Sequence, residues 1–179
     1  MRIIAGKWRG RPLLAPEGLA TRPTSARARE ALFSMLASRI GSFADMQVLD
    51  LFAGTGALGL EALSRGAAHA LFIERDAAAV RLLQQNIARL GADADVLQRD
   101  ATRPAVAPRR FDLVFLDAPY DSGASAPTLH ALTTGDWLAP DAWLAVETSR
   151  AEVLEHGDLT TVAEKAYGKA KITLLRAPG

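Results

Sequence analysis

Short apolar runs alternate with helical segments through most of the chain. Five of these runs are predicted to form strands, at 48–52, 70–73, 95–98, 111–116 and 143–147. Helices are predicted at 26–40, 58–65 and 77–90, and glycines at 66 and 91 close the last two. Strands that are apolar throughout and alternate with helices are typical of a parallel sheet covered on both faces.

The two ends of the chain depart from this alternation. Segments 160–166 and 171–175 flank Tyr167-Gly168 and are predicted to form an antiparallel hairpin. Two short strands, at 2–5 and 9–14, are predicted around Gly6 and Gly10. The predicted fold class is therefore α/β: a doubly wound, mostly parallel seven-stranded sheet with a C-terminal antiparallel hairpin and a small N-terminal extension. The corresponding division is an extension at 1–40 and a sheet domain at 41–179.

Positive charge is concentrated in the N-terminal extension. The whole chain has a net charge of +1, but residues 1–29 hold seven basic residues against one acidic residue, and the remaining 150 residues carry a net −5. Such a segment attracts polyanions, of which nucleic acid is the usual one. The candidate contacts are Lys7, Trp8, Arg9, Arg11, Arg22 and Arg27, and the Trp8 ring offers a surface on which a base could stack. A disordered basic tail is the alternative interpretation.

Composition excludes several classes of protein. The chain has no cysteine, which rules out disulfides, thiolate zinc sites and a catalytic thiol. Its three histidines lie far apart in the sequence, which argues against a histidine-built metal site. No apolar run has the length of a signal peptide or a membrane span, so we expect a cytoplasmic protein without a membrane or a metal partner.

An acidic residue stands at or just past the end of each of the first four predicted strands. These residues are Asp50, Glu74, Asp100 and Asp117. Ligands of open parallel sheets bind beyond the carboxyl ends of the strands, so the four side chains are predicted to line one site. For each residue taken alone, a structural role in a loop or a helix cap is the alternative.

The first strand leads into a glycine loop that contains Gly54 and Gly56. Together with Gly59 these residues fit the dinucleotide fingerprint, and a missing Cβ lets the backbone approach a ligand. The carboxylate of Asp50 would repel a pyrophosphate but suits the ammonium group of S-adenosylmethionine. Glu74 lies at the distance in sequence expected for a ribose-binding acid. A nicotinamide-dependent oxidoreductase is an alternative, but the chain shows no catalytic His or Tyr-Lys arrangement for it.

The fourth strand ends in Asp117-Ala118-Pro119-Tyr120. Pro119 fixes its own φ and biases Ala118 away from the helical region, which stiffens the turn. A stiff turn directs the carboxylate of Asp117 and the carbonyl of Ala118 to one point, beside the aromatic face of Tyr120. This arrangement suits a planar substrate with an NH2 group, and an ordinary aspartate turn with a packed tyrosine is the alternative.

These motifs resemble the class I S-adenosylmethionine-dependent methyltransferases, and more narrowly the bacterial RsmD family of 16S rRNA guanine-N2 methyltransferases. The resemblance is carried by 48–62 and 117–120, and extends to 2–11, 22–33 and 167–173. It covers nearly the whole chain, and the N-terminal motif is its most specific part.

The resemblance implies methyl transfer from S-adenosylmethionine to the exocyclic N2 amine of a specific guanine in 16S rRNA, on a partly assembled small subunit. The implied cofactor residues are Asp50, Phe52, Gly54, Gly56, Glu74, Arg75, Asp100 and Ala101, with Asp100 facing the adenine amino group. The implied catalytic residues are Asp117, Ala118, Pro119 and Tyr120. Ala118 stands where the family usually has proline, and this departure loosens the turn. An adenine-N6 or other amino-methyltransferase and a non-catalytic RNA-binding protein are the alternatives.

Overall fold

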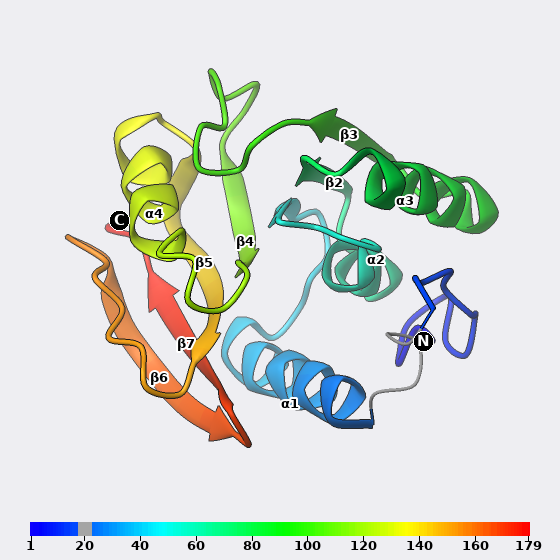
Figure 1. The fold of residues 1–179 in the computed structure, drawn as a ribbon, viewed down its shortest axis with the longest axis horizontal. Helices are drawn as coiled ribbons and strands as arrows, with labels where there is room; N and C mark the ends of the chain where they lie inside the picture. Colours follow the sequence, from blue (N-terminus) through cyan, green and yellow to red (C-terminus); the bar gives the residue numbers. More distant parts are fainter. Residues whose placement is uncertain (18–22) are drawn as a thin grey trace.

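The computed structural model describes residues 1–17 and 23–179. In this part of the chain one sheet has seven strands, in the order β3-β2-β1-β4-β5-β7-β6 (Figure 1). The strands are β1 Gln47–Leu51, β2 His69–Glu74, β3 Ala94–Gln98, β4 Phe111–Asp117, β5 Leu138–Ser149, β6 Thr160–Tyr167 and β7 Ala170–Arg176. Strands β1 to β5 pair in parallel, and β7 is antiparallel to both β5 and β6. The predicted fold class, including the C-terminal hairpin, is confirmed.

Four helices pack on the sheet within the described ranges. They are α1 Pro23–Ile40, α2 Ala57–Ser64, α3 Ala77–Leu90 and α4 Ser125–Thr134. The bounds of α3 agree with the prediction because both of its ends carry strong signals. Asp76 caps its start by accepting from the backbone N–H of Ala79, and Gly91 ends it at a positive φ of 61°. None of the described helices is long and apolar enough to cross a membrane.

Helix α4 is an element that the sequence did not reveal. Ala124 precedes its first residue and supplies no side-chain cap, and no acidic residue lies in its first turn. Without these start signals, the sequence does not predict a helix between β4 and β5.

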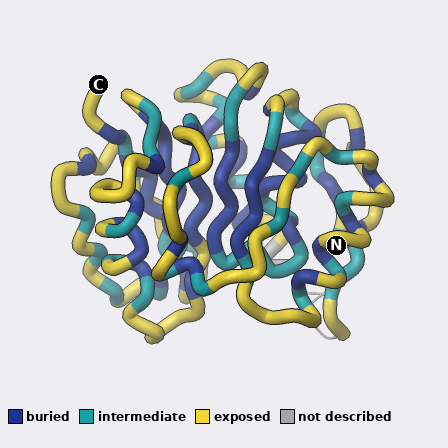
Figure 2. The backbone as a smooth tube through the Cα atoms, turned by 90° about the horizontal axis from the view of Figure 1, so that it is seen from above, coloured by how far each residue is buried: buried dark blue, intermediate teal, exposed yellow. Residues whose placement is uncertain are grey.

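Alternate residues of the strands divide the core into two layers. Val48 and Phe72 pack with buried residues of α1, α2 and α3 on one face of the sheet. Leu49 and Leu71 pack on the opposite face, where α4 lies. Figure 2 shows the central strands buried and the surrounding loops exposed. The doubly covered sheet follows from strands that are apolar on both faces.

The N-terminal segment, residues 1–14, does not form the two strands expected there. It contains one isolated antiparallel bridge, between Arg2 and Pro12. The prediction is wrong because a side chain of α2 takes backbone groups that a strand would offer to a partner. The fully buried carboxylate of Glu61 accepts from the N–H groups of Ile4 and Ala5, at 2.8 and 2.9 Å.

The N-terminal segment is nevertheless ordered and packs tightly against α2. The hydroxyl of Ser64 donates to the carbonyl oxygen of Ala5 at 2.6 Å and accepts from the N–H of Trp8 at 3.0 Å. Gly6 has a φ of +85°, and a Cβ there would lie 1.9 Å from the carbonyl oxygen of Ser64. The side chains of Ile3, Trp8 and Leu13 join the core layer of α1, α2 and α3. This segment is therefore part of the folded body, contrary to the disordered-tail alternative.

Candidate active site

The register of four neighbouring strands brings their acidic residues together. Asp117 of β4 is paired with Glu147 of β5, and Glu74 ends β2 two residues beyond the partner of Asp50. Glu74, Asp117 and Glu147 therefore lie at one level of the carboxyl edge, and Asp50 lies two residues lower. Because side chains alternate along a strand, all four carboxylates are on the face that α1, α2 and α3 cover.

Glu147 is a site residue that the sequence reasoning missed. It ends the fifth predicted strand, so extending the pattern of acidic strand ends by one strand would have found it. The hydroxyl of Tyr120 donates to the Oε1 atom of Glu147 at 2.6 Å. Burial and this bond to Glu147 raise the pKa of the Tyr120 hydroxyl above its ordinary value. The bond fixes Tyr120 beside Asp117, with 44% of its surface still exposed.

Asp117 lies at the centre of this acidic group. Removal from water by the surrounding protein and the negative charge of Glu147 together raise the pKa of Asp117 to about 7. Its side chain remains open to solvent on the cavity side. Ala118 is buried behind it, whereas Pro119 and Tyr120 are exposed.

Asp50 is a buried acid without a cationic partner among the described residues. Only 2% of its surface is exposed, and its Oδ2 atom accepts from the N–H of Gly59 at 2.9 Å. Burial, together with the charges of Asp117 and Glu74, holds the pKa of Asp50 well above its ordinary value despite the Gly59 bond. A positive group beside Asp50 would favour its ionised form.

Gly54 and Gly56 have different structural roles in the glycine loop. Gly54 has a φ of +55° and open space where a Cβ would lie, which suits close approach of a ligand. Gly56 has a φ of +80°, which residues with a side chain rarely adopt, and a Cβ there would also lie 2.3 Å from the Cδ1 atom of Leu83. Glu74 holds the loop in place by accepting from the N–H of Gly54 at 2.9 Å. The helix-cap alternative for Glu74 is not supported, because Asp76 is the cap residue of α3.

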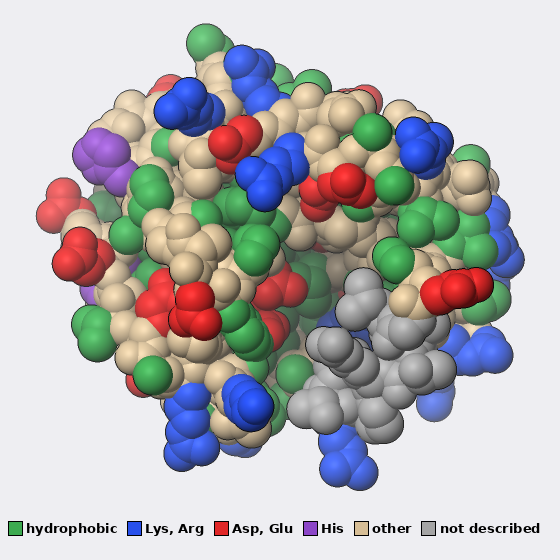
Figure 3. Space-filling model, in the orientation of Figure 1, with side chains coloured by type: hydrophobic (Ala, Val, Ile, Leu, Met, Phe, Trp, Pro, Cys, Tyr) green, Lys and Arg blue, Asp and Glu red, His purple; other side chains and the backbone are tan. Residues whose placement is uncertain are grey.

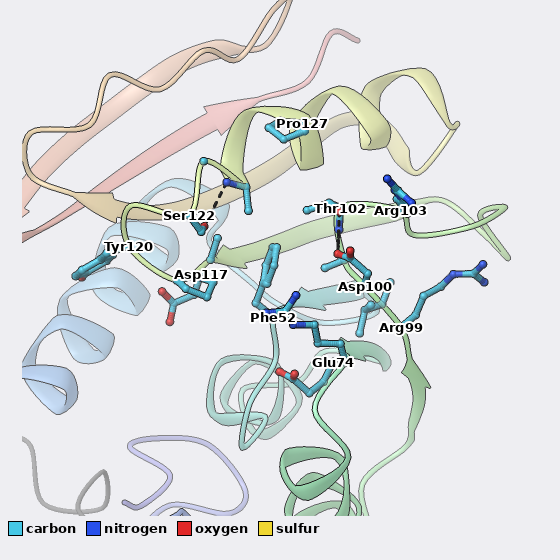
Figure 4. A pocket seen from close by; sticks show the side chains of 17 residues that line it. Phe52, Glu74, Arg99, Asp100, Thr102, Arg103, Asp117, Tyr120, Ser122 and Pro127 are labelled. Carbon is cyan, nitrogen blue, oxygen red and sulfur yellow. Dashed lines mark hydrogen bonds between the residues drawn. The ribbon is translucent and has the colours of Figure 1, made fainter.

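Two cavities open along this edge of the sheet and meet at Phe52 and Asp117. The first cavity has a volume of about 880 Å³ and contains Glu74, Arg75, Asp100, Ala101, Ala118, Pro119 and Tyr120 in its wall. The second has a volume of about 400 Å³ and is bordered by Arg29, Asp50, Gly54, Thr55 and Glu147. Phe52, held at a φ of 57°, stands between Asp117 on one side and Asp100 and Glu74 on the other (Figure 4). Of the predicted cofactor and catalytic residues, Gly56 borders neither cavity.

The far end of the first cavity is polar and has a basic rim. The Oδ1 atom of Asp100 accepts from the N–H and the hydroxyl of Thr102, at 2.9 and 2.8 Å. These bonds, with a smaller contribution from Arg75 and Arg103, lower the pKa of Asp100. Arg99 and Arg103 border the cavity but were not predicted, since they lie in a loop without a motif. Figure 3 shows acidic side chains in the hollow of this face and basic side chains mostly around its margin.

The basic residues predicted to contact nucleic acid are arranged around the N-terminal segment and α1. Lys7, Arg9, Arg11 and Arg27 are exposed, and Arg22 lies outside the described residues. Trp8 departs from the prediction, because its ring is only 8% exposed and is packed in the core. The ammonium group of Lys7 lies 4.3 Å from the centre of that ring. Trp8 therefore anchors the segment, and its ring is not available for stacking on a base.

The fold and the site together define the class of protein. A Rossmann-like sheet with β7 antiparallel beside β5 carries at its edge a glycine loop, a buried acid before it and an Asp-Ala-Pro-Tyr turn. These are the features of a class I methyltransferase. More narrowly, the sequence pattern of the family described as "Conserved hypothetical protein 95" matches residues 1–176. The chain belongs to this family, which is the RsmD family that its sequence motifs resemble.

Named relatives agree with this assignment. Ribosomal RNA small subunit methyltransferase D of Escherichia coli K12 is 41% identical over 174 residues, which cover 96% of this chain and 84% of the relative. The Haemophilus influenzae protein of the same name is 37% identical over 177 residues, covering 94% and 89%. The solved structure of the yhhF protein from Escherichia coli superposes with a TM-score of 0.88 at 40% identity, covering 100% of this chain and 98% of that chain.

The raised pKa of Asp117 is open to a direct test. Glu147→Gln removes the neighbouring negative charge but keeps an oxygen that accepts from Tyr120. We expect the pKa of Asp117 to fall from about 7 toward the ordinary carboxyl range, because a like charge disfavours ionisation. Carbon-13 NMR titration of the Asp117 carboxyl measures this change, with Glu155→Gln in an exposed loop as the control. Equal pKa values in the wild type and the Glu147→Gln variant would contradict the assigned cause.

Proposed function

We propose that the protein transfers a methyl group from S-adenosylmethionine to the exocyclic N2 amine of a specific guanine in 16S rRNA. The observation that carries the proposal is the position of Asp117, which borders both cavities at the point where they meet. A cofactor in the adjoining cavities would thus present its methyl group beside an acceptor for an amine. The names of the relatives support ribosomal RNA as the substrate.

The residues at the sheet edge fit S-adenosylmethionine. Glu74 and Asp100 border the first cavity, where they would hold the ribose hydroxyls and the adenine amino group. Asp50 is a buried acid that has no cationic partner in the part of the chain that the structure describes. It borders the second cavity, where it would take the ammonium of the methionine part. The open space at Gly54 lets the backbone approach the same part. When bound, this cofactor supplies a methyl group on a positively charged sulfur.

The turn after β4 would activate the substrate amine. The lone pair of a guanine N2 amine is delocalised into the ring, which makes the amine a poor nucleophile. Its N–H groups would donate to the Asp117 carboxylate and the Ala118 carbonyl, which draws the lone pair out of the ring plane and toward the methyl group. The contribution of the protein is then positioning and a preorganised set of acceptors. Ionised Asp117 is the form that accepts hydrogen bonds, so its pKa of about 7 matters for turnover.

Tyr120 would hold the target base at this turn. A base must leave its stack to reach the cavity, and an aromatic side chain stabilises it there by stacking, worth roughly 1–3 kcal/mol per base. The bond from Tyr120 to Glu147 keeps its half-exposed ring beside Asp117. The same clamp would accept the N6 amine of adenine, and guanine is proposed because the RsmD family acts on guanine.

The basic N-terminal segment and the start of α1 would bind the RNA backbone. Lys7, Arg9, Arg11 and Arg27 are exposed there, while Trp8 and Glu61 fix the segment to the body. Arg22 is included from the sequence alone. We propose a partly assembled small subunit in the cytoplasm as the physiological form of the substrate, as the resemblance implies.

Replacing Asp117 by alanine separates chemistry from cofactor binding. We expect the methyl-transfer rate to fall by about 100-fold or more, in the range seen when one preorganised transition-state partner is removed. Affinity for S-adenosylmethionine should stay within about 3-fold, since Asp117 acts on the amine. Single-turnover methyl transfer and calorimetry measure the two quantities, with Asp136→Ala at the opposite sheet edge as the control. A near wild-type rate in Asp117→Ala would show that the residue is merely structural.

The RNA interface predicts a specific dependence on salt. Each phosphate contact contributes roughly −0.7 to −0.9 to the slope of log affinity against log salt. Changing Arg9, Arg11 and Arg27 together to glutamine should flatten this slope by about 2 to 3 units. Fluorescence anisotropy with an rRNA fragment across a salt series measures it, and Lys165→Gln on the distant strand β6 should leave the slope unchanged. Parallel lines for the triple variant and the wild type would mean that these arginines do not contact the backbone.

A further inference from the structure

Arg29 of α1 is a buried cation that the functions described above do not use. Only 8% of its surface is exposed. Its Nη2 atom donates to the carbonyl oxygen of Arg2 at 2.7 Å. Its Nε atom is buried and has no hydrogen-bond partner in the described part of the chain. A buried donor without a partner is costly, so the position calls for an explanation.

The charge of Arg29 is also incompletely balanced. The carboxylate that favours its charged form is that of Glu61, which is itself ion-paired with Arg65 at 3.0 Å and accepts from two backbone N–H groups. Arg29 forms no ion pair of its own among the described residues. Two guanidinium groups thus share one carboxylate, which leaves one positive charge in excess. A buried charge without its own partner is destabilising unless a ligand supplies the opposite charge.

The position of Arg29 indicates which ligand would supply the opposite charge. Arg29 borders the second cavity together with Asp50, Gly54 and Thr55. One cavity therefore has a cation and a buried acid in its wall, which is the complement of an amino acid with its ammonium and carboxylate groups. A phosphate of the RNA would meet Asp50, Asp117 and Glu147 in the same wall, whereas a zwitterion with an additional positive sulfur is compatible with them.

We propose that Arg29 binds the α-carboxylate of the methionine part of S-adenosylmethionine, opposite the ammonium site at Asp50. The proposal rests on the proposed function, since it assigns one more residue to that cofactor. It also gives Arg29 a different role from that of Arg27, an exposed residue two positions earlier on α1 that is proposed to bind RNA.

Decarboxylated S-adenosylmethionine tests this role, because it lacks only the carboxylate. Calorimetry on the wild type should show tighter binding of S-adenosylmethionine by roughly 10- to 100-fold, the range of a charged hydrogen bond. In Arg29→Met this preference should disappear, so that both ligands bind within about 3-fold of each other. Arg39→Met is the matched control, since it places the same substitution at the exposed end of the same helix and should keep the full preference.

The other outcomes separate this inference from the proposed function. If Arg29→Met binds both ligands more weakly but keeps the preference, Arg29 is only structural and the inference is overturned. If it keeps the preference and loses affinity for RNA, the contact is with a phosphate and the inference is likewise overturned. If the wild type binds neither ligand, both the proposed function and this inference are overturned. If Arg29→Met unfolds below the assay temperature, Arg29→Lys is used instead, because it retains the buried charge. This variant should show an intermediate preference for S-adenosylmethionine. A full preference in Arg29→Lys would contradict the proposal.

Discussion

The parallel register of β2, β1, β4 and β5 is the constraint on which the site depends. It places Glu74, Asp117 and Glu147 at one level of the sheet edge and Asp50 two residues lower, all on the face covered by α1. A slip of one residue in any strand would turn its carboxylate to the other face. The apolar residues that alternate with these acids fill both core layers, and this burial fixes the register. The burial and the negative charge of Glu147 that together raise the pKa of Asp117 are thus consequences of the packing of the sheet.

A second constraint joins the N-terminal segment to the glycine loop. Asn86 of α3 is buried, accepts from the N–H of Leu14 at 2.7 Å and donates to the carbonyl oxygens of Leu14 and Thr55, each at 3.0 Å. Glu61 fixes the same segment to α2. The groups proposed to bind RNA phosphates are therefore held at a set distance from the glycine loop. The segment shares one core layer with the sheet.

Local signals decided how much of the structure could be predicted. Helix α3 has a cap residue at each end and was predicted with its observed bounds, whereas α4 has neither a capping side chain nor an acidic first turn and was missed. Four of the acidic site residues were predicted from their positions at or just past the ends of strands. The burial of Trp8 could not be predicted, because its side chain packs in the core with residues that are distant in sequence. Its backbone N–H likewise donates to Ser64, which is 56 residues away along the chain. The burial of Arg29, whose Nε atom has no partner within the described ranges, likewise depends on tertiary contacts that a local sequence pattern does not show.

The central claim is that Asp117 and Ala118 present a guanine amine to the methyl group of S-adenosylmethionine. The most direct test uses the purified protein, S-adenosylmethionine with a deuterated methyl group and small-subunit particles from cells that lack the enzyme. Digestion of the 16S rRNA and mass spectrometry of its nucleosides then identify the labelled product. We expect label in N2-methylguanosine at one position of the rRNA. Label in N6-methyladenosine, or no label in the rRNA, would contradict it.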